Sequence, residues 1–220
     1  MNIELRGVGL EYEGRTLFSN LQLSISQGEF TVVRGPSGCG KSSLLRLITR
    51  LQEPTTGSIW IDDRPGGEVP VTGYRRRVLY LAQTPVMVAG SVGDNLTFPF
   101  DFSAAGRTAK PTATDLKAWL QDFMLDHLPI ETDAERLSVG EQQRIALIRA
   151  LLVDPDIILC DEPASALEAD SGHVVRSRLE EAVTKDGRGV ILVEHSDYKP
   201  ASPYRELSFA MDGTLQETPA

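Results

Sequence analysis

A lysine close to three glycines is the feature of this sequence that points most directly to chemistry. The segment GPSGCGKS, residues 35–42, fits the pattern G-x-x-x-x-G-K-[ST] without a mismatch. It follows the apolar run FTVVR and opens a helical pattern, the setting in which backbone N–H groups wrap around phosphate oxygens. Lys41 would place a cation between terminal phosphates, and the Ser42 hydroxyl could ligate Mg²⁺. The residues expected to bind phosphate are Gly35, Pro36, Ser37, Gly38, Cys39, Gly40, Lys41, Ser42 and Ser43.

Two acidic residues, Asp161 and Glu162, follow the apolar run IILC at 157–160. We expect a buried strand that brings both side chains to the carboxyl edge of a sheet, where ligands bind in open α/β folds. Asp161 is suited to hold the Mg²⁺ shell through water, and Glu162 to accept a proton from an attacking water. A helix cap is the alternative, and the upstream phosphate loop favours the catalytic interpretation.

Two further polar residues end apolar strand patterns, Gln83 in RVLYLAQ and His195 in RGVILVEH. The Gln83 amide could contact both Mg²⁺ and water. His195 ends a strand that we expect to neighbour the strand of Asp161, which favours a catalytic role over a structural one. Tyr12 could stack on a nucleotide base or could equally face the core, and the sequence leaves both open.

A second predicted phosphate-binding helix start lies in the segment 136–152, RLSVGEQQRIALIRALL. Its pattern predicts an amphipathic helix that begins near Ser138 and Gly140. One phosphate loop already serves one triphosphate, so this helix end has no local partner. It could reach a nucleotide held by another copy of the chain. The pattern therefore predicts a head-to-tail dimer with two nucleotides in its interface, held by ATP and released by hydrolysis.

Apolar runs that alternate with helical patterns indicate βαβ units and a parallel sheet covered on both sides. The expected helices run from Lys41 to near Glu53 with Leu51 on the apolar face, over 112–125 with Thr114 or Thr112 as the cap, from Ser138, and over 168–187. The segment 64–70 reads as a loop. The expected strands are 2–12, 16–25, 30–34, 55–63, 77–83, the run within 154–163, 188–195 and a hairpin over 207–217 with a turn at Asp212-Gly213.

The composition is that of a globular protein, with 41% hydrophobic and 24% charged residues. A net charge of −9 argues against a broad nucleic-acid or anionic-membrane surface. The dense basic run YRRRV, 74–78, is interpreted as a solvated strand or loop edge. Cys39 and Cys160 indicate neither a disulfide framework nor a metal site. No signal peptide or membrane span is expected, which predicts a cytoplasmic protein.

The motifs and their order along the chain resemble those of the nucleotide-binding subunit of an ABC (ATP-binding cassette) transporter, over essentially the whole chain. The resemblance implies an α/β fold of the P-loop NTPase type, with a mainly parallel core sheet, an N-terminal antiparallel β subdomain and an inserted helical subdomain. It implies one domain over 1–220, in which 1–84 and 155–220 form the core and about 85–154 the helical subdomain. The motifs that carry the resemblance are Tyr12, the loop 35–42, Gln83, LSVGEQQR at 137–144, IILCDE at 157–162, SALE at 165–168 and His195.

The resemblance also implies an ATPase with ATP and Mg²⁺ as cofactors and an ATP-sandwich dimer. In that dimer Glu162 would be the catalytic base and His195 the γ-phosphate switch, and Ser42, Gln83 and Asp161 would serve the metal. Gln83 would couple the site to helices of a membrane permease docked near 84–100, which places the chain peripherally on the inner face of the cell membrane. The signature positions implied to contact the nucleotide are Ser138, Gly140 and Glu141.

Within the family, AQTPVMVAGSVGDNLTFPF at 82–100 resembles bacterial ATP-binding subunits linked to iron export. The chain departs from the family pattern at Val139, where a glycine is usual, and at Glu168, where an aspartate is usual. The valine is expected to hinder closure over ATP, and the longer acid to loosen communication between the two sites. The alternative function is a non-transport ABC ATPase that acts on nucleic acid or the ribosome, although no nucleic-acid partner is expected from the acidic charge balance.

Overall fold

The computed structural model describes residues 1–102 and 109–219, with the backbone alone at 218 and 219. It divides into two compact units. The first comprises Met1–Tyr80, Asp156–Glu162 and Glu180–Ala220, and the second comprises Leu81–Pro155 and Pro163–Leu179. Within the described ranges, no helix combines the length and the apolar character that crossing a membrane requires.

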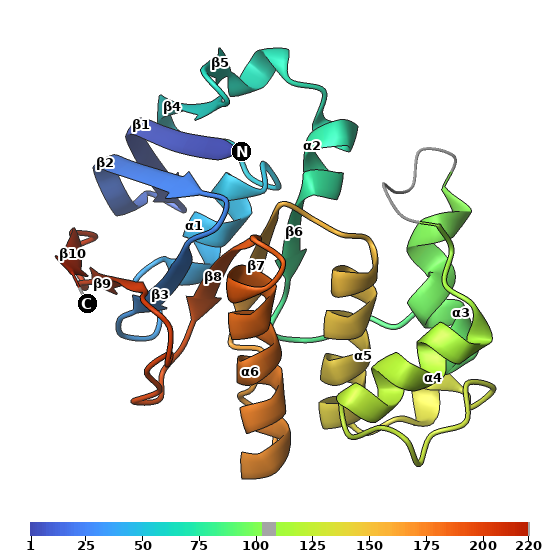
Figure 1. The fold of residues 1–220 in the computed structure, drawn as a ribbon. Coiled ribbons are helices and arrows are strands. Elements are labelled where there is room, and N and C mark those ends of the chain that lie inside the picture. The colour runs from blue at the N-terminus through green and yellow to red at the C-terminus, as the bar shows by residue number, and fades with distance from the viewer. Residues whose placement is uncertain (103–108, 220) are drawn as a thin grey trace. The chain divides into compact units, whose positions relative to one another are not determined.

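The first unit contains an antiparallel sheet of order β2-β1-β4-β5 (Figure 1). Apolar side chains of β1, such as Ile3, Leu5 and Val8, are buried, and the strand pairs with β2 on one side and β4 on the other. The strands are β1 (Asn2–Tyr12), β2 (Arg15–Ser26), β4 (Thr56–Ile61) and β5 (Arg64–Pro65). The segment 64–70, predicted as a loop, contains β5 and the short 3-10 helix η1 (Gly66–Glu68).

A six-stranded sheet of order β10-β9-β3-β8-β7-β6 forms the other layer of this unit. β8 pairs in parallel with β3 and with β7, and β9 pairs in parallel with β3, whereas β10 closes the predicted antiparallel hairpin with β9. The predictions of a mainly parallel sheet and of a C-terminal hairpin are confirmed. The strands are β3 (Phe30–Arg34), β6 (Val78–Leu81), β7 (Ile157–Asp161), β8 (Gly189–Val193), β9 (Arg205–Phe209) and β10 (Leu215–Pro219).

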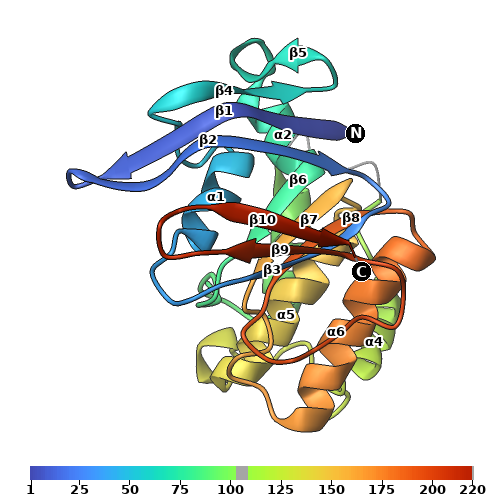
Figure 2. The same cartoon turned by 90° about the vertical axis from the view of Figure 1, so that its left-hand side faces the viewer.

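Helix α1 (Lys41–Ile48) lies between the two sheets in both views of the fold (Figures 1 and 2). Its residues Leu44, Leu45, Leu47 and Ile48 belong to one apolar core that also includes side chains of both sheets. Burial of this face on two sides explains why an eight-residue helix is stable here, because a helix of this length is marginal alone.

The prediction that this helix extends to Glu53 is wrong. The helix ends in a Schellman turn, in which Arg50 N–H donates to Leu47 O at 2.8 Å and Leu51 N–H donates to Arg46 O at 2.8 Å. Arg50 adopts the left-handed conformation that this turn requires, with φ 56. As a result Leu51 points outward and is 52% exposed instead of buried.

The prediction that YRRRV is a strand or loop edge is also wrong, because Tyr74 to Arg77 lie in helix α2 (Val71–Arg77) and only Val78 belongs to a strand, β6. Tyr74 is buried, and its hydroxyl donates to Ile48 O at the end of α1. The Arg75 side chain donates to Thr49 O at 3.3 Å. Three arginines in the last turn also suit the negative end of a helix dipole, so the run caps two helices and is structural.

The second unit is mainly helical. Of the two threonines predicted as possible caps of α4, Thr112 is the cap. Leu116 and Leu120 of this helix and Phe123 just after it are buried, and the Trp119 ring stacks on the Phe123 ring with 6.1 Å between centroids. The prediction that α5 is amphipathic is wrong, because from Gln143 to Leu152 only Arg149 is not buried. The elements are α3 (Val92–Thr97), η2 (Phe98–Asp101), α4 (Ala113–Asp122), η3 (Ala134–Arg136), α5 (Val139–Leu152) and most of α6 (Ala169–Thr184).

Candidate active site

The loop between β3 and α1 depends on glycines. Gly35 has φ 150, and a side-chain carbon placed on it would lie 2.6 Å from Phe209 O. Gly40 has φ 108 and is the N-cap of α1, with no side chain to satisfy the free N–H groups of the first turn. Those N–H groups are therefore available to an anion, as at other helix starts that bind phosphate.

Lys41 lies inside this loop and is only 6% exposed. Its Nζ donates to Gly35 O at 2.8 Å and to Pro36 O at 2.9 Å. A buried ammonium requires such acceptors, because it loses its hydration on burial. The two bonds hold the charge against the loop backbone, where an anion bound by the N–H groups would meet it.

Parallel pairing brings three chain segments to one edge of the six-stranded sheet. Val33 on β3 and Asp161 on β7 both pair with Val193 on β8. The phosphate loop, the acidic pair and His195 therefore all follow strands that end side by side, as predicted for His195 and Asp161. β8 ends at Val193, so His195 lies two residues beyond the strand and not at its end, and Gln83 likewise follows β6 by two residues.

Asp161 is almost completely buried, at 3% exposed. The Tyr80 hydroxyl on β6 donates to Asp161 Oδ2 at 3.0 Å. Burial, together with the charge and hydrogen bond of Asp161, raises the pKa of Tyr80 to about 12. The tyrosine therefore keeps its proton at neutral pH and remains a donor to the carboxylate.

Glu162 and His195 form an ion pair, with 2.8 Å between Glu162 Oε1 and His195 Nε2. Glu162 has φ 51, a left-handed backbone that costs a residue with a side chain about 1–3 kcal/mol. Its N–H donates to Val193 O at 3.2 Å, which ties this strained residue to the end of β8. This left-handed residue directly follows β7 and carries the side chain that contacts His195.

The start of α5 is a capping box of Ser138 and Glu141. The Ser138 hydroxyl accepts from Glu141 N–H at 3.3 Å and donates to Glu141 Oε2 at 2.8 Å. His127 Nε2 lies 3.0 Å from Glu141 Oε1. Partial burial would raise the pKa of Glu141, but hydrogen bonds from His127 and Ser138 outweigh it and lower that pKa. Gly140 is packed so closely that an added side-chain carbon would lie 3.0 Å from Leu167 Cδ2.

Gln83 and Tyr12 are both on the surface. Gln83 belongs to the second unit, as do Ser138, Gly140 and Glu141, and its backbone oxygen accepts from Gln143 Nε2 at 3.2 Å. Tyr12 is the last residue of β1 and is 60% exposed, which excludes the alternative of a core residue. Its ring is accessible to a base.

A family model described as "ABC transporter" matches residues 18–165, well over half of the chain. The chain belongs to the ABC transporter family. Domains of this family bind and hydrolyse ATP, so this ABC domain is an ATPase, and the predicted cassette fold is confirmed.

Relatives of this ABC domain include separate ATP-binding proteins and longer transporters. The chain is 34% identical over 193 residues to "Probable iron export ATP-binding protein FetA" of Escherichia coli (strain K12), covering 88% of this chain and 84% of that protein. It is 35% identical to "ABC transporter B family member 1" of Dictyostelium discoideum, of which it spans 22%. A solved "bacterial Atm1-family ABC exporter with ATP bound" superposes with a TM-score of 0.81 and 25% identity over 96% of this chain and 37% of that one.

Sequence reasoning missed several residues around the site. Arg34, just before the phosphate loop, donates from Nη1 to Ser196 O at 2.5 Å and from Nη2 to Tyr198 O, and so holds the segment that follows His195. Glu194 Oε1 accepts the N–H of His195 at 3.1 Å. A charged residue at the end of the apolar run FTVVR was the available signal for Arg34. Polar residues inside or after apolar runs were the signals for Tyr80 and Glu194.

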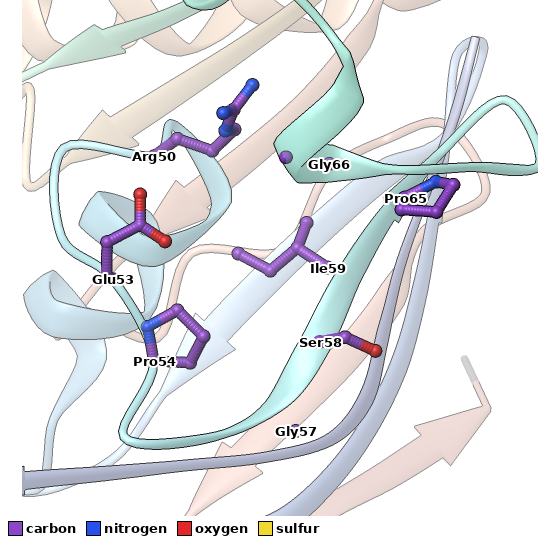
Figure 3. Close-up of a pocket in the computed structure, with 9 residues that line it drawn as sticks. Arg50, Glu53, Pro54, Gly57, Ser58, Ile59, Pro65 and Gly66 are labelled. Atoms are coloured by element: carbon purple, nitrogen blue, oxygen red, sulfur yellow. The ribbon is translucent and has the colours of Figure 1, made fainter.

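A cavity of about 240 Å³ lies elsewhere in the first unit (Figure 3). Arg50, Glu53 and Ile59 are among its lining residues, and none of the predicted catalytic residues is. The Arg50 guanidinium donates to Val69 O at 2.7 Å and lies over the Tyr74 ring, so its role there is structural. The cavity is therefore separate from the ATPase site.

Proposed function

We propose that this chain is the ATP-hydrolysing subunit of an export-type ABC transporter, and that it works as an ATP-dependent head-to-tail dimer docked on a membrane permease. The observation that carries the proposal is the convergence of the phosphate loop, Asp161 and the Glu162–His195 pair at one sheet edge. A nucleotide in the loop would present its terminal phosphate at that edge.

In the proposed hydrolysis, Glu162 accepts a proton from the attacking water. The carboxylate needs a fixed direction for this, and the left-handed backbone with the His195 contact supports one. With ATP bound, His195 Nε2 would exchange its bond to Glu162 for one to a γ-phosphate oxygen. The two side chains thus respond together to the presence of the phosphate.

The residues at the site suit magnesium. Mg²⁺ prefers oxygen ligands and keeps several waters, and the proposed holders, Ser42, Gln83 and Asp161, offer a hydroxyl, an amide oxygen and a carboxylate. The buried Asp161 carboxylate is already oriented by a hydrogen bond from Tyr80. When bound with ATP, the ion neutralises negative charge on the phosphates as the bond breaks.

In the proposed dimer, Ser138, Gly140 and Glu141 of one copy contact the triphosphate that Lys41 holds in the other. The capping box places the Ser138 hydroxyl and the first N–H groups of α5 at an exposed helix start, which supports an anion contact. Gly140 allows a close backbone approach there. Tyr12, exposed at the end of β1, would stack on the adenine.

The transporter assignment is supported by FetA, which this chain matches over most of its length, and by the fold likeness to an Atm1-family exporter. We further propose that the transported cargo is iron, as the name of FetA states for that protein, with the segment 84–100 contacting the permease. The chain would then lie at the inner face of the membrane. Loss of the gene should raise the iron content of the cell, and unchanged metal content would contradict the cargo.

The dimer is tested in a Glu162→Gln background, in which bound ATP should persist. With Ser138 unchanged, the mass measured by light scattering should double when ATP is added. Ser138→Asp keeps a good N-cap but adds a charge against the phosphate, so it should abolish the dimer, whereas Ser138→Asn keeps the cap without charge and should retain it. A dimer of equal affinity in Ser138→Asp and Ser138→Asn would refute the proposed contact.

A further inference from the structure

Tyr80 makes a direct side-chain contact with the proposed magnesium-binding carboxylate. It lies on β6, the neighbour of β7 in the sheet, and its hydroxyl donates to Asp161 Oδ2 at 3.0 Å. Asp161 is 3% exposed, so its carboxylate has lost most of its hydration and depends on such donors. The sequence interval between the two residues is 81, and no motif links them.

The direction of this hydrogen bond is determined by the groups on either side of the hydroxyl. An ionised carboxylate only accepts hydrogen bonds and a guanidinium only donates them, whereas a tyrosine hydroxyl does both. The Arg46 guanidinium interacts with the Tyr80 hydroxyl from α1. Because the ionised carboxylate can only accept, the tyrosine proton points at Asp161.

The interaction with Arg46 relates Tyr80 to α1, the helix that carries Ser42, another of the proposed metal ligands. Arg46 lies four residues after Ser42 on α1, so both residues are on one face of that helix. α1 packs against β7 within the first unit. The Tyr80 hydroxyl therefore contacts the Asp161 carboxylate and also interacts electrostatically with Arg46 on the helix of Ser42.

We infer that Tyr80 is a positioning residue for magnesium: its hydroxyl holds Asp161 Oδ2 and so fixes the orientation of the carboxylate that would hold the ion. This rests on the proposed function of the site. Tyr80 touches neither ATP nor the metal and acts only through Asp161. Residues that orient a metal ligand in this way typically change metal affinity by about 10–100-fold when they are replaced.

The test is Tyr80→Phe in the full chain, which removes the hydroxyl and leaves the ring. Mn²⁺ is the probe, titrated by electron paramagnetic resonance in the presence of ADP, so no turnover is required. We expect the half-saturating Mn²⁺ concentration to rise about tenfold, at the lower end of the range for such residues. ADP affinity without metal should stay within about twofold, because Lys41 and the loop are unchanged.

Tyr74→Phe is the matched control, since it deletes another tyrosine hydroxyl of the first unit, one that donates to Ile48 O at the opposite end of α1 from Ser42. It should lower thermal stability and leave the Mn²⁺ titration unchanged. Equal Mn²⁺ titrations for wild type and Tyr80→Phe, or an equal weakening in both variants, would overturn the inference. A wild-type chain that binds no Mn²⁺ with ADP would instead contradict the proposed function.

Discussion

Two carboxylates flank strand β7, Asp156 before it and Glu162 after it. Neutralising one should lower stability, and neutralising the other should lower the rate of hydrolysis. Glu162 follows the strand and pairs with His195 at 2.8 Å, whereas Asp156 precedes it and pairs with Arg77 at 2.6 Å. Glu162→Gln and Asp156→Asn are the same chemical change, a carboxylate to an amide. If Glu162 is the base, only the first change affects hydrolysis.

The expected magnitudes follow from the environment of each group. A general base contributes about 10²–10⁴-fold to a rate, so Glu162→Gln should lower kcat by that factor, or about 2.7–5.4 kcal/mol in the barrier. His195 is largely exposed, so the Glu162 pair adds at most about 1 kcal/mol to the free energy of unfolding. Asp156 is 2% exposed, so losing its charge beside Arg77 should cost about 1–3 kcal/mol of that free energy.

The assay is phosphate release at saturating Mg²⁺ and ATP, paired with urea unfolding followed by circular dichroism. Glu162→Gln should lose turnover while it keeps its unfolding midpoint and its affinity for ATP. Asp156→Asn should unfold at lower urea and keep kcat within about twofold at temperatures where it is folded. Turnover of Glu162→Gln within tenfold of the wild type would refute the assignment of the base.

Three further changes test other parts of the site. Arg34→Ala frees the segment after His195 and should lower kcat about 10–100-fold in steady-state kinetics, with little change in KM. Arg34→Lys should restore part of the lost kcat. A KM change alone would contradict this role. Glu141→Gln keeps the capping box but removes a negative charge near the phosphate. The ATP concentration that gives half-maximal dimer in light scattering should therefore fall about fivefold, which corresponds to about 1 kcal/mol of repulsion removed. A rise in that concentration would contradict the proposed repulsion. The pKa of Tyr80 is raised from 10.0 to about 12, so its contribution to stability is present below pH 10.0 and lost as the pH rises toward 12. Tyr80→Phe should therefore lose less stability over that interval than the wild type in alkaline unfolding, and identical losses would refute the shift.

The parts of the site that the sequence determined are local. The phosphate loop, the Asp161-Glu162 pair, the cap at Ser138 and the Asp212-Gly213 turn each lie within a few consecutive residues. Their geometry depends on backbone conformations and hydrogen bonds that those residues supply themselves. The alternation of apolar runs and helices was enough to predict a mainly parallel sheet, because only a sheet covered by helices buries such runs.

Tertiary structure decided the contacts between strands. The order β3-β8-β7-β6 places His195 beside Glu162 and Tyr80 beside Asp161, and the side chain of Arg34 reaches a carbonyl 162 residues away. Tertiary packing also placed Tyr74 to Arg77 in a helix and buried α5 on nearly all sides. In both places the contacts with neighbouring elements outweigh the preference that the local sequence pattern indicates. Strand order depends on which apolar faces pack together, a property of the whole core that no short segment encodes.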